Sequence, residues 1–545
     1  MTPQETPPQQ TAQQETAQQE TAQQQMPPQQ TAQQQTAPGE FDGFPRAPEL
    51  VEPEPVPDWR RLDLRMLVVR PLNELVGLVP VVVGLLVFGS GDRWRFLSGV
   101  GVVVVVVGVG LLSWLTTRYR ITAEQVELRK GLLVRKRLAV PRDRIRTVDL
   151  TAKLGHRLFG LSAIRVGTGQ HEKAGEDGLT LDAVSSQEAE RLRQVLLDRA
   201  PAASPAAGAV PDTADAPPGE ELARLDPRWL RFAPLTLSGL VAVGTTFGVL
   251  MNYAQELDLH PSSSTIDWLT GSPIAVTVAV AAAVVLVLAV IGSLLIYVLQ
   301  FWNFRLTREA DGTVRVRRGL LTTRSVSVEE QRLRGVEVQQ PLLLRAGRGA
   351  RAAAVTTGLG SKGESSVLLP PAPASEAHRV AAAVLGVAES PTRAPLAAHP
   401  VAALRRRLVR AVVPVLVLAG VLAVVAPDWT WRAALALVPF AALLGWDRYR
   451  ALGHALTERY LVTRSGSAVR ETVALQRGGV IGWRLHRSFF QRRAGLITVT
   501  ATTAAGDGSY AVIDVGEAEG LALADAAVPD LLRPFLTTEP APAKP

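Results

Sequence analysis

Apolar residues are gathered into long, nearly uninterrupted runs, and these runs come in pairs along the chain. Each run is about twenty residues long, the length that crosses the hydrocarbon core of a bilayer as an α-helix. A short or polar loop separates the two members of each pair. The pattern therefore predicts six transmembrane helices arranged as three hairpins. The expected spans are residues 72–88 and 96–115, 232–251 and 274–299, and 408–425 and 431–446.

The sixth span has the least definite limits. It is short, contains Pro439 and begins beside Arg432, whose side chain would have to reach the membrane surface. The sequence leaves its two ends open.

Positive charge indicates the orientation of these helices. The middle loop, residues 252–272, contains no Lys or Arg. Cytoplasmic flanks of membrane proteins are enriched in Lys and Arg, so we predict a multi-pass plasma-membrane protein whose N- and C-termini and long connections are cytoplasmic. The arginines on that side are Arg60, Arg61, Arg65, Arg70, Arg118, Arg120, Arg305, Arg405, Arg406, Arg407, Arg448 and Arg450.

Composition supports a membrane protein and narrows its partners. The chain has 545 residues, enough for three or four units, and 47% of them are hydrophobic. Its formal charge of +8 raises the question of nucleic acid, but the arginines flank apolar runs and do not form one basic domain with interleaved aromatic residues. We expect membrane lipids as partners and no nucleic acid.

The first 57 residues differ from the rest in composition. They repeat a TAQQE or TAQQQ unit and are rich in Gln, Pro and Thr. Such a segment cannot bury a core, so we expect it to be disordered. It lacks the features of a signal peptide, and the first membrane helix is expected to act as the insertion signal.

The same order of sequence features follows each predicted hairpin. The segments YRIT and FRLT, at residues 119–122 and 304–307, each precede an alternating segment that ends in Gly-Leu-Leu at Gly131 and Gly319. A degenerate third copy keeps a Ser-Gly turn at Gly466. Alternation interrupted by a glycine predicts a β-hairpin. A fixed order of features found three times predicts three copies of one domain, each with about seven strands and a closing helix.

The closing helix is clearest in the first copy. Ser185 and Glu188 have the spacing of a capping box, and Leu192, Val195 and Leu196 form an apolar stripe. The resulting division is a Gln/Pro-rich tail (1–57), transmembrane hairpins (66–117, 229–302 and 404–447), strand-rich domains (118–200, 303–388 and 453–535, the last degenerate), linkers (201–228 and 389–403) and a C-terminal tail (536–545).

This order resembles a known family. A membrane hairpin, the YRIT strand, the Gly-Leu-Leu turn, Arg144-Ile145 and the Arg-Leu-Phe-Gly run at residues 157–160 are similar to the bacterial pleckstrin-homology-like membrane proteins of the YdbT-like group. The resemblance covers the chain from about residue 58 onward. It implies α+β domains, each an antiparallel β-barrel or sandwich with a C-terminal helix. It also implies a membrane location, no known catalytic activity and a smaller membrane protein with one such domain as a frequent companion.

Basic residues around the first two predicted β-hairpins are the candidate contacts for anionic lipid. Clustered cations beside a membrane gain roughly 1 kcal/mol each from anionic headgroups, without a dedicated pocket. Nonspecific attraction and capture of a particular headgroup both remain open for them. The candidates are Lys130, Arg135, Lys136 and Arg137 in the first domain and Arg315, Arg317 and Arg318 in the second.

Gly358, Gly360 and Gly363 match the G-x-G-x-x-G pattern of dinucleotide-binding proteins. The segment that follows them is a predicted strand and not a helix, so no helix N-terminus is available for a pyrophosphate. We interpret the pattern as a hairpin turn.

Catalytic and metal-binding motifs are not evident in the sequence. The chain has no cysteine, and its seven histidines are scattered without metal-ligand spacing. No nucleophile elbow or Walker loop occurs in a fitting context. We therefore expect no enzyme activity, no cofactor and no metal.

Three functional hypotheses remain open. The first is a noncatalytic membrane scaffold whose pleckstrin-homology-like (PH-like) domains bind lipids or proteins in an envelope function, with a smaller PH-like membrane protein or a second copy of the chain as the protein partner. The second is a component of a transport or channel system. The third is an enzyme acting on lipid-linked substrates. Spans free of ionisable residues in their central thirds favour the first.

Overall fold

The structure is a computed structural model, and every residue that it describes lies in one compact unit, Pro57–Pro545. The described residues are 59–66, 117–122, 124–131, 136–145, 147–167, 179–197, 219–236, 273–357, 366–529 and 531–532, with isolated positions between 69 and 116 and between 238 and 248. The predicted tails, nearly all of the first hairpin and most of the linker 201–228 lie outside them.

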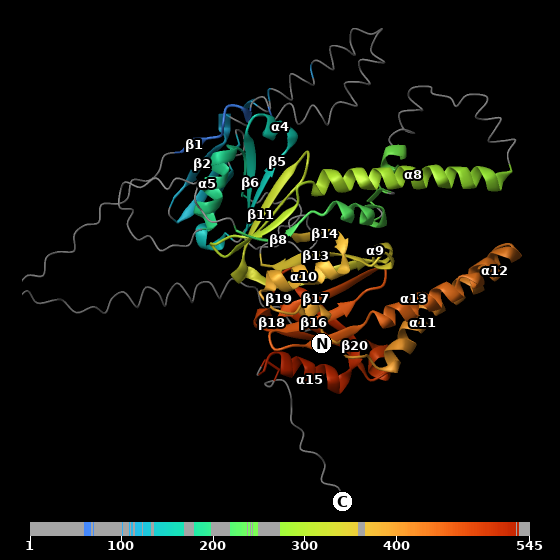
Figure 1. Cartoon of the computed structure of the whole chain (residues 1–545). Helices are drawn as coiled ribbons and strands as arrows, with labels where there is room; N and C mark the ends of the chain where they lie inside the picture. The colour runs from blue at the N-terminus through green and yellow to red at the C-terminus, as the bar shows by residue number, and fades with distance from the viewer. Residues whose placement is uncertain are drawn as a thin grey trace, which may run out of the picture. The chain divides into compact units, whose positions relative to one another are not determined.

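Two helices within the described ranges are long and apolar enough to cross a membrane. They are α8 (Ile274–Phe301) and α11 (Val401–Val425), which match two of the predicted spans (Figure 1). The apolar side chains of α8 are exposed over most of its length, as expected for a helix that meets lipid and not a protein core.

The sixth predicted span is not a single long helix. It is divided into α12 (Asp428–Ala436) and α13 (Val438–Arg450), with the break at Leu437, just before Pro439. Both pieces pack against α11. A proline cannot donate a backbone hydrogen bond and clashes with the preceding turn, which accounts for the break. Neither piece alone is long enough to span a bilayer.

The predicted start of the third span, at Phe232, is wrong. Residues Pro227–Thr236 form the 3-10 helix η2, and Phe232 is buried in the core of the second domain. An apolar run has the same appearance whether it meets lipid or a protein core, so hydropathy alone places this boundary too early. The described positions between 238 and 248 are helical.

Each strand-rich region contains six described strands in the same order, rather than the seven or so expected. In the first region these are β2 (Arg118–Ile121), β3 (Gln125–Lys130), β4 (Lys136–Pro141), β5 (Thr147–Ala152), β6 (Leu161–Gly167) and β7 (Leu179–Ser185). In the second they are β9 (Arg305–Arg308), β10 (Thr313–Arg318), β11 (Thr323–Glu329), β12 (Leu333–Pro341), β13 (Gly349–Thr356) and β14 (Val367–Pro373). In the third they are β15 (Gly453–Leu456), β16 (Tyr460–Ser465), β17 (Val469–Gln476), β18 (Val480–His486), β19 (Leu496–Thr503) and β20 (Ser509–Gly516).

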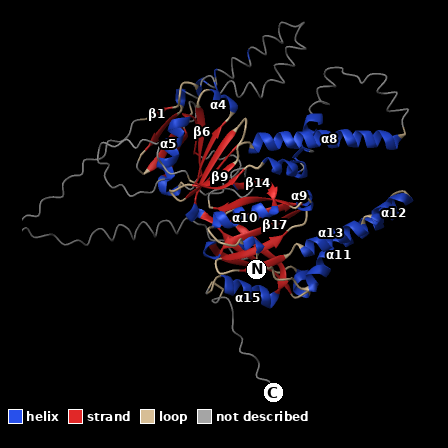
Figure 2. Ribbon diagram, viewed as in Figure 1, coloured by secondary structure: helices blue, strands red, loops and turns tan. Residues whose placement is uncertain are grey.

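Helical elements recur at the same places in this order (Figure 2). A 3-10 turn follows the third strand, and a five-residue helix follows the fourth. A longer helix closes each copy. The turns are η1 (Arg142–Arg144), η3 (Glu330–Arg332) and η6 (Arg477–Gly479), the short helices are α4 (Leu154–Leu158), α9 (Leu342–Ala346) and α14 (Phe489–Arg493), and the closing helices are α5 (Ser186–Leu197), α10 (Ala374–Leu385) and α15 (Glu517–Ala527).

The glycines predicted to form hairpin turns have the backbone conformation that such turns require. Gly131, Gly319 and Gly466 have φ values of 104°, 109° and 96°. A Cβ atom at Gly319 would lie 2.0 Å from the backbone oxygen of Thr322. Only glycine adopts this conformation without a steric cost, so the turn between the second and third strands can be read directly from the sequence.

The closing helix of the first copy begins as predicted. The backbone N–H of Glu188 donates a hydrogen bond of 3.2 Å to Oγ of Ser185. Leu192 and Leu196 are buried against the sheet, whereas Val195 is exposed, so the apolar stripe is narrower than predicted.

The strand pairing crosses from one copy of the domain to the next. Two large sheets have the strand orders β7-β6-β5-β11-β10-β9-β8, where β8 is Glu220–Arg224, and β14-β13-β12-β17-β16-β15. In the first, β5 of one copy pairs with β11 of the next, and in the second β12 pairs with β17. The smaller sheets are β1-β2-β3-β4, where β1 is Arg60–Arg61, and β18-β19-β20. The domains are thus joined edge to edge, and we call the pairs β5–β11 and β12–β17 the first and second junctions.

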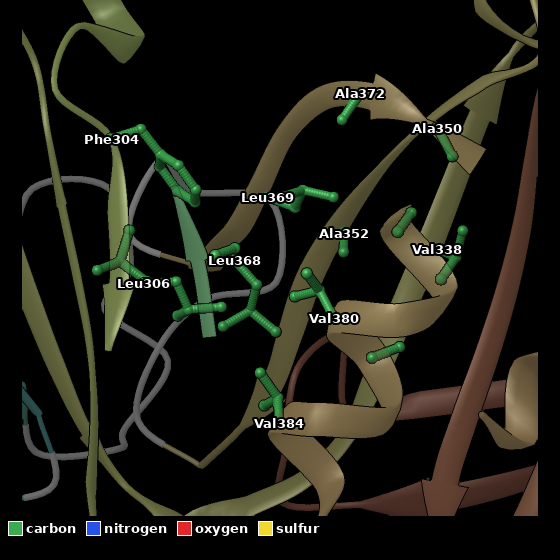
Figure 3. Close-up of a cluster of buried hydrophobic side chains, with 14 of the residues drawn as sticks. Phe304, Leu306, Val338, Ala350, Ala352, Leu368, Leu369, Ala372, Val380 and Val384 are labelled. Carbon is green, nitrogen blue, oxygen red and sulfur yellow. The ribbon is translucent and has the colours of Figure 1, made fainter. Parts of the chain in front are cut away.

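The largest cluster of buried apolar side chains belongs to the second domain. Leu306 and Leu369 come from its strands, Val380 from its closing helix and Phe304 from the position just before β9, and all four belong to this cluster (Figure 3). Burying side chains of this size stabilises the fold by about 1.5–3 kcal/mol each. The first and third domains have separate clusters of the same kind.

Candidate functional site

The basic hairpin of the first domain is partly engaged in an internal ion pair. Nη2 of Arg137 donates a hydrogen bond of 2.7 Å to Glu127, and Arg120 donates another of 2.8 Å. The hydrogen bond from Arg137 is the largest influence on the pKa of Glu127, and the net effect of its surroundings is to hold that pKa below its ordinary value, although burial opposes it. The side chain of Arg137 is still 56% exposed.

The structure gives less information on two other candidate residues of this hairpin, Arg135 and Lys136. Arg135 lies outside the described residues. Lys136 pairs through its backbone with Lys130 at the ends of β4 and β3. Their contact with anionic lipid stays a prediction.

The matching residues of the second domain are mostly turned inward. Arg315 binds Glu190 and Glu309 at 2.8 and 3.1 Å. Arg318 is 5% exposed, and its guanidinium lies over the ring of Phe301, 5.2 Å from the centroid. Of the three arginines predicted here, Arg317 is the exposed one. Contact of these three arginines with anionic lipid stays a prediction.

The turn between β10 and β11 is attached to the end of α8. The backbone N–H groups of Gly319 and Leu320 each donate a hydrogen bond of 2.9 Å, to the carbonyl oxygens of Trp302 and Leu299 respectively. Arg157 of the first domain donates to the carbonyl oxygen of Leu320. The first junction therefore lies against the end of a membrane helix.

Two carboxylates attach the third domain to its membrane helices. Asp447 of α13 accepts hydrogen bonds from Arg345 and Ser467 at 3.1 and 2.9 Å. Asp514 of β20 is fully buried and accepts from Arg406, from Arg407 at 2.9 Å and from Gln491 at 2.8 Å. Charge-assisted bonds of this kind are short and strong, so they hold helix and domain in a defined arrangement.

A wide, open pocket of about 660 Å³ lies at the first junction, beside the end of α8. Its charged lining combines four cations with two carboxylates: Lys153, Arg165, Arg318, Arg324, Asp149 and Asp182. Leu299 and Leu321 add apolar surface at the side of the membrane helix. The lining therefore carries a net positive charge next to the expected membrane surface.

The cations of this pocket are not equivalent. Arg324 of β11 binds Asp149 of β5 at 2.6 Å, which also fixes the junction. Arg165 and Lys153 are exposed on β6 and just after β5. Cations on a rigid sheet at a membrane surface can hold an anionic headgroup.

The sequence does not point to this pocket. Arg165 is a single charge within an alternating strand, and Lys153 is a single charge before a short helix. Arg165 and Lys153 become candidates only once the first junction is known, because the junction brings β5 and β6 beside the turn at Gly319.

The G-x-G-x-x-G segment lies outside the described residues, but its flanks are informative. The strands before and after it, β13 and β14, pair antiparallel with each other. This arrangement supports a hairpin and not the strand-to-helix turn of a dinucleotide site. Within the described ranges, no group of three or more His, Asp and Glu residues is placed to hold a metal ion.

The second junction contains a carboxyl group with a strongly shifted pKa. Glu337 of β12 is 4% exposed, and burial raises its pKa to about 7, with a further contribution from Glu471 of β17. Between its ordinary pKa near 4.5 and this value, the folded chain holds a proton that the unfolded chain releases. The stabilising contribution of this group is therefore complete below about pH 4.5 and is lost as the pH rises through about 7.

We therefore expect Glu337→Gln to raise the stability of the protein at about pH 8 by about 1–3 kcal/mol and to leave it nearly unchanged at about pH 5. The measurement is thermal unfolding of the purified protein at both pH values. Glu458→Gln, at an exposed position, is the matched control. An equal effect of Glu337→Gln at the two pH values would show that this carboxyl group is not the source of the pH dependence.

Comparison with known proteins identifies the repeated unit. The bacterial PH domain family matches three segments of the chain, residues 73–200, 267–388 and 408–525. The UPF0699 transmembrane protein YdbT of Bacillus subtilis (strain 168) is 21% identical over 450 residues, which cover 79% of this chain and 89% of that protein. No solved structure matches the chain.

The three matched segments include the six-strand copies described above and together cover more than half of the chain. The second and third segments also include all or part of the apolar helices that precede their strands, α8 in the second and α11 to α13 in the third. The family likewise agrees with the resemblance seen in the sequence. The chain is a membrane protein of the bacterial PH domain family, with three copies of the domain and a similarity to YdbT.

Proposed function

We propose that the chain is a noncatalytic, multi-pass protein of the plasma membrane that presents three PH-like domains in the cytoplasm to lipid headgroups and to proteins, in a function of the cell envelope. In this proposal the chain crosses the membrane with six helices arranged as three hairpins. Two of the six are helices of sufficient length in the described part of the chain, and α12 and α13 follow α11 where the sixth is expected.

The observation that carries the lipid part of the proposal is the pocket at the first junction. It combines net positive charge with apolar side chains at the end of a membrane helix, which is the chemistry of a site for an anionic phospholipid headgroup. In this proposal Lys153 and Arg165 contact the phosphate, and Leu299 and Leu321 lie beside the acyl chains.

We expect the double substitution Lys153→Ala and Arg165→Ala to weaken retention of phosphatidylglycerol by the full-length protein about tenfold or more, because each cation near the surface contributes roughly 1 kcal/mol. The protein would be reconstituted in vesicles of equal parts phosphatidylglycerol and phosphatidylcholine and extracted into detergent. The bound lipid would then be measured by mass spectrometry.

The matched control changes two exposed arginines elsewhere, Arg191→Ala and Arg459→Ala, and so removes the same net charge. Equal loss of lipid from both double variants would show a general effect of charge and would contradict a headgroup site at the first junction. Unchanged retention in the Lys153 and Arg165 variant would contradict it as well.

The proposed orientation can be tested because the chain has no cysteine. A cysteine in place of His260, in the loop without positive charge, is expected to react with an impermeant thiol reagent in intact cells. A cysteine in place of Arg317 is expected to react only after the membrane is opened. Arg317 is the suitable position because it is exposed, whereas the neighbouring Arg318 is buried. The opposite labelling pattern would overturn the orientation.

A further inference from the structure

The two junctions between domains follow one register. In the first, Thr147 of β5 lies opposite Val328 of β11. In the second, Gly335 of β12 lies opposite Leu475 of β17. Val328 of the first junction is equivalent to Leu475 of the second, because each lies opposite the second residue of the preceding strand. The fourth strand of one domain therefore pairs with the third strand of the next in the same way twice.

Among the described residues, one fourth strand and one third strand are not paired with a strand of another domain. The fourth strand of the last domain, β18, pairs there with β19 alone, and the third strand of the first domain, β4, with β3 alone. Unpaired N–H and C=O groups at the edge of a sheet are able to accept another strand.

Burial shows what these edges lack. The four central positions that are buried in β5 and β12 are half-buried or exposed in β18, where Leu485 is 38% exposed. Three of the four matching positions in β4 are exposed, although all four are buried in β11 and β17. The lower burial of these positions in β18 is expected if β18 pairs with a strand that belongs to another protein.

Charge indicates which neighbour fits. The third residue of β5, Asp149, is equivalent to Glu337 and Arg484, since each lies opposite the fifth residue of the following strand. In the first junction this position faces Arg324 of the neighbouring third strand diagonally, and the two form an ion pair. In β18 the same position is an arginine, so the favourable partner at the diagonal position is a carboxylate.

A second copy of this chain does not satisfy that requirement. Its available third strand is β4, where Lys136 occupies the position of Arg324. Pairing would bring Arg484 and Lys136 together in a partly buried place. In the second junction the like pair Glu337 and Glu471 is relieved because Glu337 can keep a proton. An arginine cannot lose its proton in this way.

We propose that β18 is the docking edge for the third strand of a PH-like domain of a second protein, and that this strand carries a carboxylate at the position equivalent to Glu471. The strand would add antiparallel to β18, in the register of the two junctions, and would extend the row of domains on the same side of the membrane. The inference concerns a different surface from the lipid pocket, so the two can fail separately.

A variant of this chain can serve as the defined partner in the test. Two differently tagged full-length chains would be co-expressed, one with Leu485→Cys in β18 and the other with Arg137→Cys in β4. In the register of the junctions these two positions lie opposite each other. Since the chain has no native cysteine, a mixed disulfide after mild oxidation can form only between these two introduced positions.

With Lys136 unchanged we expect little mixed disulfide. With Lys136→Glu in the second chain we expect at least a roughly tenfold increase, because the like-charge contact becomes an ion pair. Arg484→Glu in the first chain, with Lys136 unchanged, should produce a similar increase. Combining Arg484→Glu with Lys136→Glu should abolish the increase in mixed disulfide.

Two controls keep the result interpretable. Ala139→Cys in place of Arg137→Cys shifts the expected register by two residues and should give less disulfide. Thermal unfolding of each chain alone would show that the substitutions do not disrupt the fold. Equal cross-linking in all four charge combinations, or strong cross-linking of the chains with Lys136 and Arg484 unchanged, would overturn the proposal. The proposal would also be overturned if neither Lys136→Glu nor Arg484→Glu alone increased the mixed disulfide, in chains shown to be folded.

Discussion

Asp514→Ala is expected to destabilise the third PH-like domain by about 3–5 kcal/mol, because it leaves two half-buried arginines without their partner. Asp514 is fully buried and binds Arg406 and Arg407, which belong to the membrane helix α11. Its φ of 61° is in the left-handed region, where alanine pays a further cost that aspartate and asparagine largely avoid. The substitution should therefore loosen the attachment of the domain to α11 as well.

Comparison with Asp514→Asn separates charge from backbone conformation. Asparagine tolerates the same φ and can accept some of the hydrogen bonds, but it does not neutralise the arginines. We expect it to recover only part of the loss. The measurements are thermal unfolding in detergent and the rate of proteolysis between α11 and the strands. Glu458→Ala, at an exposed position, is the control. A change of less than about 1 kcal/mol for Asp514→Ala would show that Asp514 does not hold the domain to the helix.

Phe304→Ala is expected to cost a similar amount, about 3–5 kcal/mol, for a different reason. Phe304 is fully buried in the apolar cluster of the second domain, close after the end of α8 (Figure 3). Removing the ring leaves a cavity that the surrounding strands and α10 cannot fill without moving, since protein interiors are close-packed. The loss should lower the unfolding temperature of the second domain.

Two comparisons test this explanation. Phe304→Leu keeps much of the volume and should cost clearly less than the alanine variant. Phe490→Ala removes a ring that is 72% exposed on α14, and it should have an effect within about 0.5 kcal/mol. If Phe304→Ala and Phe490→Ala had equal effects, packing in this cluster would not be the source of the stability.

The features that the sequence predicts best are those encoded within a few residues. The turns at Gly131, Gly319 and Gly466 require glycine for a steric reason, and they occur where expected. The closing helix of the first domain is recognisable from its cap at Ser185 and from the spacing of Leu192 and Leu196. Repetition of these local signals is sufficient to identify the three domains.

The surroundings of the basic residues could not be predicted in the same way. Arg315 alternates with valines in β10, a pattern that places it on the outer face of an isolated domain. That face is covered by α5 of the preceding domain, so Arg315 meets Glu190 and not solvent. The covering helix is about 125 residues away in sequence, a distance over which periodicity carries no information. The pocket at the first junction was missed for the same reason.

The first junction also has a consequence for biosynthesis. Strand β5 ends at residue 152, and its neighbour β11 begins at residue 323, so about 170 residues must leave the ribosome between them. At roughly 5–20 residues per second this takes on the order of 10–35 s, during which β5 has no neighbour on that side and Asp149 lacks Arg324. The same interval includes insertion of α8 into the membrane. Completion of the first domain is thus delayed until the second hairpin has been inserted, and a nascent chain stalled in this interval would carry an open sheet edge for chaperones to protect.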